Sequence, residues 1–159
     1  MFLLDLTQAF HENNVPYVVV GGYALAFHNI VRATVDIDLI IRLKLEDFEK
    51  CEIILKKLGL TSRLPVQAKD IFEFRKEYVE NRNLIAWSFV DYKNPARAVD
   101  ILINHDIKHI KIKKISLHGK MVNIASLENL LSLKEEANRP QDQMDIVKIK
   151  EKLHEQKKS

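Results

Sequence analysis

Hydrophobic and polar positions follow two different spacings along the first half of the chain. Apolar side chains recur at every third or fourth position in some segments, which predicts amphipathic helices, and form short uninterrupted runs in others, which predicts buried strands. The predicted order is helix, strand, helix, strand and helix, over residues 1–13, 17–20, 21–30, 35–41 and 45–58. Pro16 supports the end of the first helix, because proline disfavours helical geometry in the residue before it.

Strand patterns dominate the second half of the chain until helical spacing returns near its end. The predicted strands cover residues 71–74, 84–90, 98–103, 107–117 and 120–124, the last two joined as a hairpin around His118-Gly119, and the predicted helices begin at residues 126 and 141. This order indicates an α+β fold with a mixed β-sheet, helices packed mainly on one face and two C-terminal helices. Carboxylates on the strands are then expected on the opposite face.

Length and composition are those of one domain. The chain has 159 residues, of which 47% are hydrophobic and 30% charged, as is usual for a globular protein. We therefore expect a single domain over residues 1–159, with an α/β core over 1–125 and the C-terminal helices over 126–155.

Charge and cysteine content exclude several classes of site. The net charge of +3 is small, although lysines gather over residues 108–120 and after residue 148. The one cysteine, Cys51, excludes an intrachain disulfide and a zinc site built from cysteines, and its helical spacing predicts a core position. The sequence shows no signal-peptide pattern and no apolar run near the ~20 residues of a membrane span, so we expect a cytoplasmic protein without membrane contact.

A glycine pair and an acidic triplet stand close together in the first half of the chain. Gly21-Gly22 follows the first predicted strand, and thirteen residues separate it from Asp36-Ile37-Asp38. Side chains two positions apart on a strand point the same way, so Asp36 and Asp38 are expected to converge. Like charges placed together need a cation to neutralise them, which indicates a divalent metal. A glycine turn that exposes backbone amides suits phosphate, and together the two features indicate phosphoryl-transfer chemistry.

This pattern resembles the signature of the DNA polymerase beta-like nucleotidyltransferase superfamily, in which an apolar strand leads to Gly-Gly or Gly-Ser and then to an acidic–apolar–acidic triplet. In that superfamily a later strand supplies a third carboxylate. The best candidate here is Asp100, framed by apolar residues, and Asp91 is its rival. Residues 127–145, which contain Leu-Glu-Asn-Leu-Leu-Ser-Leu-Lys and Arg-Pro-Gln-Asp-Gln-Met-Asp, resemble the end of small nucleotidyltransferases related to abortive-infection, type IV toxin–antitoxin toxins.

The resemblance implies a site for two magnesium ions and a nucleoside triphosphate. Asp36 and Asp38 would bind the metal on the nucleotide side, and Asp100 would share the second metal close to the acceptor hydroxyl. The backbone amides after Gly21 and Gly22 would hold the β- and γ-phosphates. Further candidates are Arg32, Thr34 and Lys134 near the nucleotide, with Asp142 and Asp145 orienting Lys134 or Arg139.

The implied function is a magnesium-dependent nucleotidyltransferase that moves a nucleoside monophosphate from a triphosphate such as ATP to a hydroxyl group. The acceptor stays open between an RNA end such as that of tRNA, a protein side chain and a small molecule. A cognate antitoxin or a second copy of the chain is a candidate partner. Two other functions also stay open: a non-catalytic nucleotide-binding toxin–antitoxin component, and a basic RNA-binding module built on the lysines of residues 108–120.

Several of the candidate residues have a simpler interpretation. Arg32 can be a solvated cation at a helix end. The residues of the C-terminal motif can be caps and ion pairs on a helix surface, namely Lys134, Arg139, Asp142 and Asp145. The lysines of the hairpin can be the solvated side chains of an edge strand, which resist aggregation.

Overall fold

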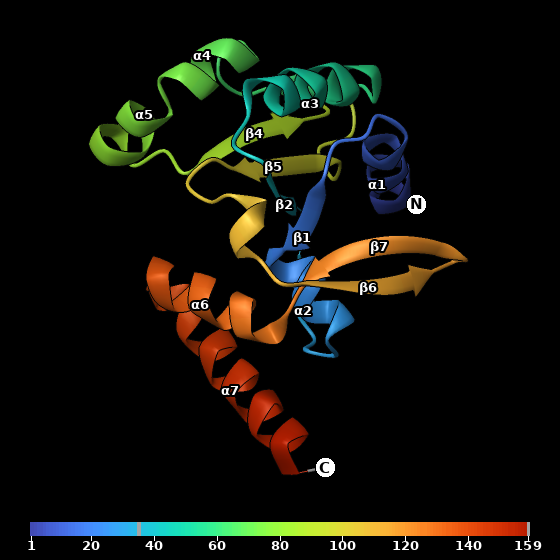
Figure 1. Ribbon diagram of the computed structural model, residues 1–159, viewed down its shortest axis with the longest axis vertical. Helices are drawn as coiled ribbons and strands as arrows, with labels where there is room; N and C mark the ends of the chain where they lie inside the picture. Colours follow the sequence, from blue (N-terminus) through green and yellow to red (C-terminus); the bar gives the residue numbers. More distant parts are fainter. Residues whose placement is uncertain (35, 159) are drawn as a thin grey trace.

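One mixed β-sheet runs through the molecule and carries helices on its faces (Figure 1). The computed structural model describes residues 1–34 and 36–158. Its helices are α1 (Phe2–Glu12), α2 (Gly21–Phe27), α3 (Leu45–Lys57), α4 (Ala68–Glu73), α5 (Arg75–Arg82), α6 (Leu127–Ala137) and α7 (Gln143–Lys158), with 3-10 turns η1 (Ile107–His109) and η2 (Pro140–Asp142). Its strands are β1 (Tyr17–Val20), β2 (Ile37–Ile41), β3 (Thr61–Ser62), β4 (Ala86–Val90), β5 (Ala98–Leu102), β6 (Ile112–Leu117) and β7 (Lys120–Ala125).

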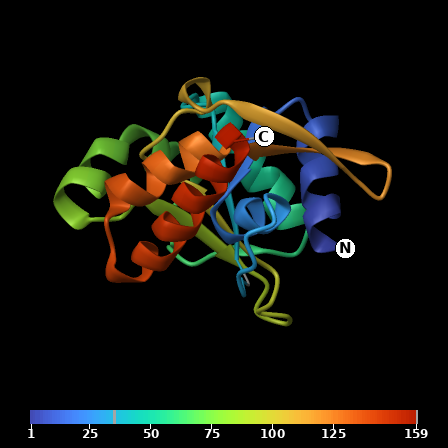
Figure 2. The ribbon, with the colours of Figure 1, turned by 90° about the horizontal axis from the view of Figure 1, so that it is seen from below.

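The strands are ordered β3-β4-β5-β2-β1-β7-β6 across the sheet. The pairs β2–β5 and β1–β7 are parallel, and the other neighbours are antiparallel, so the predicted mixed α+β sheet is confirmed. The lysine-rich strand β6 lies at one edge, and the β6–β7 hairpin extends beside α1 (Figures 1 and 2). This position agrees with the interpretation of its lysines as side chains of an edge strand.

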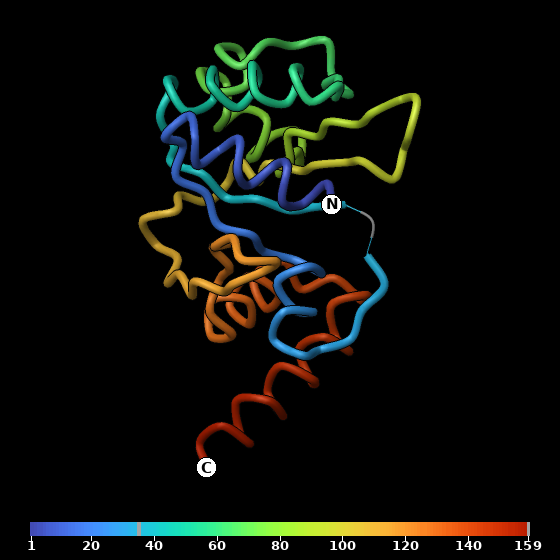
Figure 3. The backbone as a smooth tube through the Cα atoms, turned by 90° about the vertical axis from the view of Figure 1, so that its right-hand side faces the viewer, coloured from blue at the N-terminus to red at the C-terminus, as the bar shows by residue number. Residues whose placement is uncertain are grey.

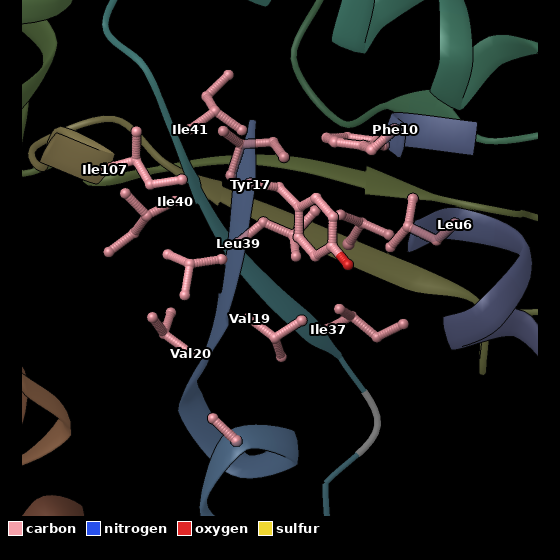
Figure 4. Packing of buried hydrophobic residues seen from close by; sticks show 14 of the residues in the cluster. Leu6, Phe10, Tyr17, Val19, Val20, Ile37, Leu39, Ile40, Ile41 and Ile107 are labelled. Atoms are coloured by element: carbon pink, nitrogen blue, oxygen red, sulfur yellow. The ribbon is translucent and has the colours of Figure 1, made fainter. Parts of the chain in front are cut away.

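One face of the sheet is covered by α1 and α3, which bury the large apolar side chains of the strands. Phe10 of α1 packs edge-on against Tyr17 of β1, with ring centroids 5.9 Å apart. Phe48 of α3 stacks on Trp87 of β4 at 5.8 Å. Figure 4 shows Phe10 beside Tyr17, whereas Val20 lies on the other side of the strands. Helices α1 and α3 therefore cover one face, as the apolar spacing predicts, and Cys51 of α3 is buried in this core.

The opposite face carries acidic side chains at its centre. Asp38 of β2 and Asp100 of β5 are register partners, so both point away from the core face that holds Leu39 and Ile101. Side chains of α6 face these strands across a cavity. Helix α7 packs on α6 and continues away from the sheet to the C-terminus (Figure 3). This is the face on which the sequence pattern predicts the carboxylates of the strands.

Several sequence-based boundaries are wrong, each for a local reason. Residues 71–74, predicted as a strand, lie mainly in α4, which begins where the backbone N–H of Gln67 donates to Asp70 at 3.3 Å. The helix after the glycines ends at Phe27 and not near residue 30, and Asn29 adopts a left-handed φ of 64° just beyond it. The first hairpin strand begins at Ile112, after a 3-10 turn. Position 35, the predicted start of the second strand, lies outside the described residues.

Helix length and hydropathy bear on membrane contact. No helix within residues 1–34 and 36–158 is both long enough and apolar enough to cross a bilayer.

Candidate active site

Asp38 and Asp100 form a pair of carboxylates on the face that the core helices leave uncovered. Both are partly buried, and Asp36 lies exposed just before β2. Burial, followed by the charges of Asp100 and Asp36, raises the pKa of Asp38 to about 7, although Lys134 and Arg139 oppose the shift. Burial is also the main cause that raises the pKa of Asp100. The site therefore favours a proton or a metal cation between these carboxylates.

The two predicted glycines bring the backbone directly against this site. Gly21 follows Val20, the register partner of Asp38, and has a φ of 67°. A Cβ atom at Gly21 would lie 2.1 Å from Oδ2 of Asp38, which no side chain could tolerate without displacing the carboxylate. A Cβ at Gly22 would lie 2.7 Å from the Cβ of Thr34. Both positions thus depend on glycine for the close approach of β1, α2 and the segment before β2.

Three cationic side chains stand beside the carboxylates, each held by an acidic partner. The Nζ atom of Lys134 lies 3.2 Å from Oδ1 of Asp142 and 3.2 Å from Oδ2 of Asp145. Arg32 forms an ion pair with the same carboxylate of Asp145. Arg139 donates from Nε and Nη2 to Asp142, each at 2.9 Å. The pairs join the loop after α2 to the last turn of α6 and the start of α7.

Burial distinguishes this network from surface ion pairs. The side chain of Asp142 is fully buried, and that of Lys134 is only 10% exposed. Burial opposes ionisation of Asp142, but hydrogen bonds from Arg139 and Lys134 outweigh it and lower the pKa of Asp142 to about 2. Burial is the main cause that lowers the pKa of Lys134, and its hydrogen bond to Asp142 opposes the shift. The interpretation of these residues as caps and ion pairs holds for Asp142, which accepts a hydrogen bond from the backbone N–H of Arg139 at 3.1 Å and pairs with Lys134, but both side chains are buried and do not lie on a helix surface.

A polar cavity of about 360 Å³ lies where these groups meet, and we call it the polar cavity. All eight candidate site residues from the sequence line it, together with Ala33 and Arg139: Gly21, Gly22, Arg32, Thr34, Asp36, Asp38, Asp100 and Lys134. Residues more than a hundred positions apart in the chain are thus gathered around one opening. Three carboxylates and three cations line the cavity together, which suits a polyanion bound with a divalent cation.

The donor atoms of the site are of the kind that binds Mg²⁺, but their positions only partly form a metal site. Oxygen ligands from Asp38 and Asp100 are the kind that magnesium prefers, and their raised pKa values mark negative charge that lacks full compensation. Asp36 is exposed to solvent. Among the described residues, no three His, Cys, Asp or Glu side chains are arranged so that they could hold a metal. Substrate phosphate oxygens or a rotation of Asp36 would have to complete such a site.

Asp91, the rival third carboxylate, lines neither cavity near the site. Its Oδ2 atom accepts a hydrogen bond from Nη1 of Arg97 at 3.0 Å, and its Oδ1 atom accepts one from the backbone N–H of Lys93 at 2.9 Å. These bonds close the loop between β4 and β5. Of the two rivals, the structure brings Asp100 to the site and gives Asp91 a structural partner.

A second, more apolar cavity of about 440 Å³ adjoins the polar cavity, and we call it the apolar cavity. The two share Gly21, Asp38, Asp100, Lys134 and Arg139. The remaining residues of the apolar cavity, which sequence reasoning missed, are Val20, Ile85, Ala86, Leu102, Asn104, His105, Leu130, Leu133, Glu136 and Ala137. The spacing of Asp100, Leu102 and Asn104, two residues apart at and beyond the end of β5, is a sequence signal that points to two of them.

Comparison with known proteins supports the fold. Neither a protein-family model nor a curated protein matches this sequence significantly. Among solved structures, the antibiotic-resistance factor ANT(2'')-Ia superimposes with a TM-score of 0.61 at 15% identity, over 93% of this chain and 80% of that one. The lincosamide antibiotic adenylyltransferase LnuA, with lincomycin bound, gives a TM-score of 0.61 at 13% identity over 94% of both chains. An antigenic nucleotidyltransferase-like protein of Paracoccidioides brasiliensis gives 0.55 at 16% identity, over 93% of this chain and 72% of that one.

These similarities show that the chain has the nucleotidyltransferase fold. The identities are too low to carry substrates from one protein to another, so the reaction has to be argued from the site itself.

Proposed function

We propose that this chain is a magnesium-dependent nucleotidyltransferase that transfers a nucleoside monophosphate from a nucleoside triphosphate to a hydroxyl group and releases pyrophosphate. The observation that carries the proposal is the polar cavity, in which the predicted glycines, carboxylates and cations all meet. The fold shared with two antibiotic-modifying proteins supports the same class of reaction. The relation to toxin–antitoxin enzymes stays a prediction.

In the proposed reaction the triphosphate lies in the polar cavity. The acceptor oxygen forms a bond to the α-phosphorus, and the bond from that phosphorus to the β-phosphate bridging oxygen breaks. Arg32, Lys134 and Arg139 neutralise the charge of the leaving pyrophosphate. Asp100 accepts the proton of the attacking hydroxyl, for which a carboxyl group with a raised pKa is suited.

Magnesium bound by Asp36, Asp38 and Asp100 would supply charge neutralisation at the phosphates and lower the pKa of the attacking hydroxyl. The chain itself fixes the surrounding groups. Gly21 permits the backbone to approach Asp38, and the buried pairs with Asp142 and Asp145 hold the cations in position. Such prior organisation of charge is a major source of rate enhancement in enzymes.

The residues of the site do not select one class of acceptor, so several classes should be tested. ANT(2'')-Ia has been solved with adenylyl-2''-tobramycin, and LnuA with lincomycin, so ATP and small hydroxylated antibiotics are the first reagents to test here. An RNA end or a protein side chain remains in the set of acceptors, and a partner chain would be needed if the apolar cavity alone cannot hold the acceptor.

Thermal unfolding with each of the four nucleoside triphosphates, with and without magnesium, tests the proposed site. We expect nucleotide plus metal to raise the melting temperature of the wild type, and Asp38→Asn or Asp100→Asn to abolish this rise. Asp5→Asn, at an exposed position on α1, is the matched control and should respond like the wild type. Stabilisation by nucleotide that is equal in the presence of EDTA, or equal in all variants, would contradict the proposal.

A further inference from the structure

Strand β6 forms one edge of the sheet and leaves part of its backbone without a partner. The backbone N–H of Ser126 donates to the carbonyl oxygen of Lys111 at 2.9 Å, so the backbone groups of alternate residues from Lys111 onward point toward β7. The N–H and C=O groups of the residues between them, Ile112, Lys114 and Ser116, point outward. Among the described residues these groups have no hydrogen-bond partner, and we call this row the β6 edge.

The β6 edge lacks most of the features by which proteins prevent a strand edge from pairing. Its six register pairs with β7 are consecutive, without a bulge, and residues 108–120 contain no proline. Four of the six residues of β6 are exposed, so no described helix or loop covers the edge. The strand at the other edge of the sheet, β3, has only two residues. Charge therefore decides what can pair with β6.

The charge around β6 is entirely positive. Residues 107–127 contain no acidic residue and five lysines, namely Lys108, Lys111, Lys113, Lys114 and Lys120. A second copy that paired antiparallel with all three outward residues would set Lys114 opposite its own counterpart. Like charges in that position are destabilising, whereas opposite charges stabilise the pair. The β6 edge therefore disfavours a second copy of the chain and favours an acidic strand.

The order of side chains along β6 specifies which acidic strand fits. In an added antiparallel strand, four consecutive residues lie opposite Ile115, Lys114, Lys113 and Ile112 in turn. Acidic side chains match the two lysines. Apolar side chains match the two isoleucines, of which Ile112 is 39% exposed and Ile115 is partly buried. The complementary sequence is therefore apolar, acidic, acidic, apolar.

We infer that the β6 edge binds an extended segment of a partner protein, which adds to the sheet as an antiparallel strand and carries two consecutive acidic residues between apolar ones. In this mode of recognition the backbone hydrogen bonds supply affinity and the side chains supply specificity. No residue of β6 lines the polar cavity or the apolar cavity. The inference is thus independent of the proposed function.

An NMR titration of the isotope-labelled protein with the peptide acetyl-Thr-Val-Glu-Glu-Val-Thr-amide tests this inference. We expect the amide signals of Ile112, Lys114 and Ser116 to shift most. N-methylation of the first glutamate removes the N–H that faces Lys114 and should weaken binding about tenfold. The same change at the second glutamate, whose N–H points away from β6, should be tolerated. This pair of peptides separates strand addition from simple attraction between charges.

Charge reversal tests the role of the lysines. The double variant Lys113→Glu with Lys114→Glu should bind the peptide about tenfold more weakly. It should bind better than the wild type to a peptide that carries lysine in place of both glutamates. Lys148→Glu with Lys150→Glu, at exposed positions of α7, is the matched control, because it changes the net charge equally and should bind like the wild type. Equal binding by the two double variants, or an equal loss with either N-methylated peptide, would overturn the inference.

Two other occupants of the β6 edge would also overturn it. A short oligouridylate that binds the same lysines more tightly than the peptide does would assign the edge to nucleic acid. A dimer in sedimentation equilibrium that Ser116→Pro converts to a monomer would assign the edge to a second copy, since proline there removes an outward N–H and no hydrogen bond to β7.

Discussion

Asp38 is a carboxylate that the folded chain holds in a partly buried place next to two other acidic side chains. Its pKa is raised from 3.8 to about 7, mainly by burial and then by the charges of Asp100 and Asp36. A rise of this size corresponds to about 4 kcal/mol that disfavours the ionised form in the folded state. Replacing Asp38 by Asn removes the charge with almost no change of shape, so the ligand-free variant should be more stable than the wild type at neutral pH.

The sign and the pH window follow from linkage. The unfolded chain releases this proton near pH 3.8 and the folded chain near pH 7, so between these values the folded state holds more protons. Stability of the wild type therefore falls as pH rises through this window, and the fall is complete above pH 7. Between pH 5 and pH 8 the advantage of Asp38→Asn should grow by about 2–3 kcal/mol.

Urea unfolding at pH 5 and pH 8 in EDTA measures this difference. Asp5→Asn, in which an exposed carboxylate is replaced, should show no such growth with pH. Asp38→Asn should also lose all transfer activity, so that the variant gains stability as it loses function. Two results would refute this reasoning about the ionised form of Asp38. One is that Asp38→Asn is less stable than the wild type at pH 8, and the other is that its gain in free energy of unfolding is the same at both pH values.

Three further predictions concern the glycine turn, the buried cation and the metal. Gly21→Ala should abolish activity and lower stability by more than about 2 kcal/mol, because its Cβ would displace Asp38. Gly119 has a similar positive φ but no neighbour within 4 Å, so Gly119→Ala should lose only about 1 kcal/mol of stability and stay active. Urea unfolding and turnover measurements distinguish the two variants. Lys134→Gln should weaken the binding of inorganic tripolyphosphate at least tenfold and lower stability by about 1–3 kcal/mol, because it removes one of the two cations that pair with the buried carboxylate of Asp142 and leaves only Arg139. The double variant with Asp142→Asn should not recover the binding; calorimetry and urea unfolding measure both effects. Removal of magnesium with EDTA should leave the far-ultraviolet circular dichroism unchanged and abolish nucleotide binding; loss of structure in EDTA would contradict this.

The parts of the fold that sequence spacing predicted are those where local pattern and burial agree. The run from Tyr17 to Val20 is buried at every position, and the alternation around Asp38 places Ile37 and Leu39 in the core. The glycine pair and the Asp36-Ile37-Asp38 triplet lie in one chain segment, so the sequence gives their separation along the chain. Their common cavity was therefore predictable in outline.

Elsewhere, tertiary contacts and capping decided what pattern alone could not. The alternation at residues 71–74 is short, and the hydrogen bond between Gln67 and Asp70 starts a helix there instead. Lys134 and Asp142 have the spacing of residues on a helix surface, and only the packing of α6 against α7 buries them. The apolar cavity is lined by residues of β4, β5 and α6 together, so the pattern of no single segment predicts it.

In the proposed reaction the polar cavity promotes attack on the α-phosphorus of a nucleoside triphosphate. The direct measurement is the transfer of label from ATP carrying phosphorus-32 at either the α or the γ position, with magnesium and a panel of hydroxylated acceptors. We expect the α-label to move to an acceptor and the γ-label to appear in pyrophosphate, and we expect Asp38→Asn to support neither transfer. Transfer of γ-label to an acceptor, or transfer of α-label that persists in Asp38→Asn, would contradict this expectation.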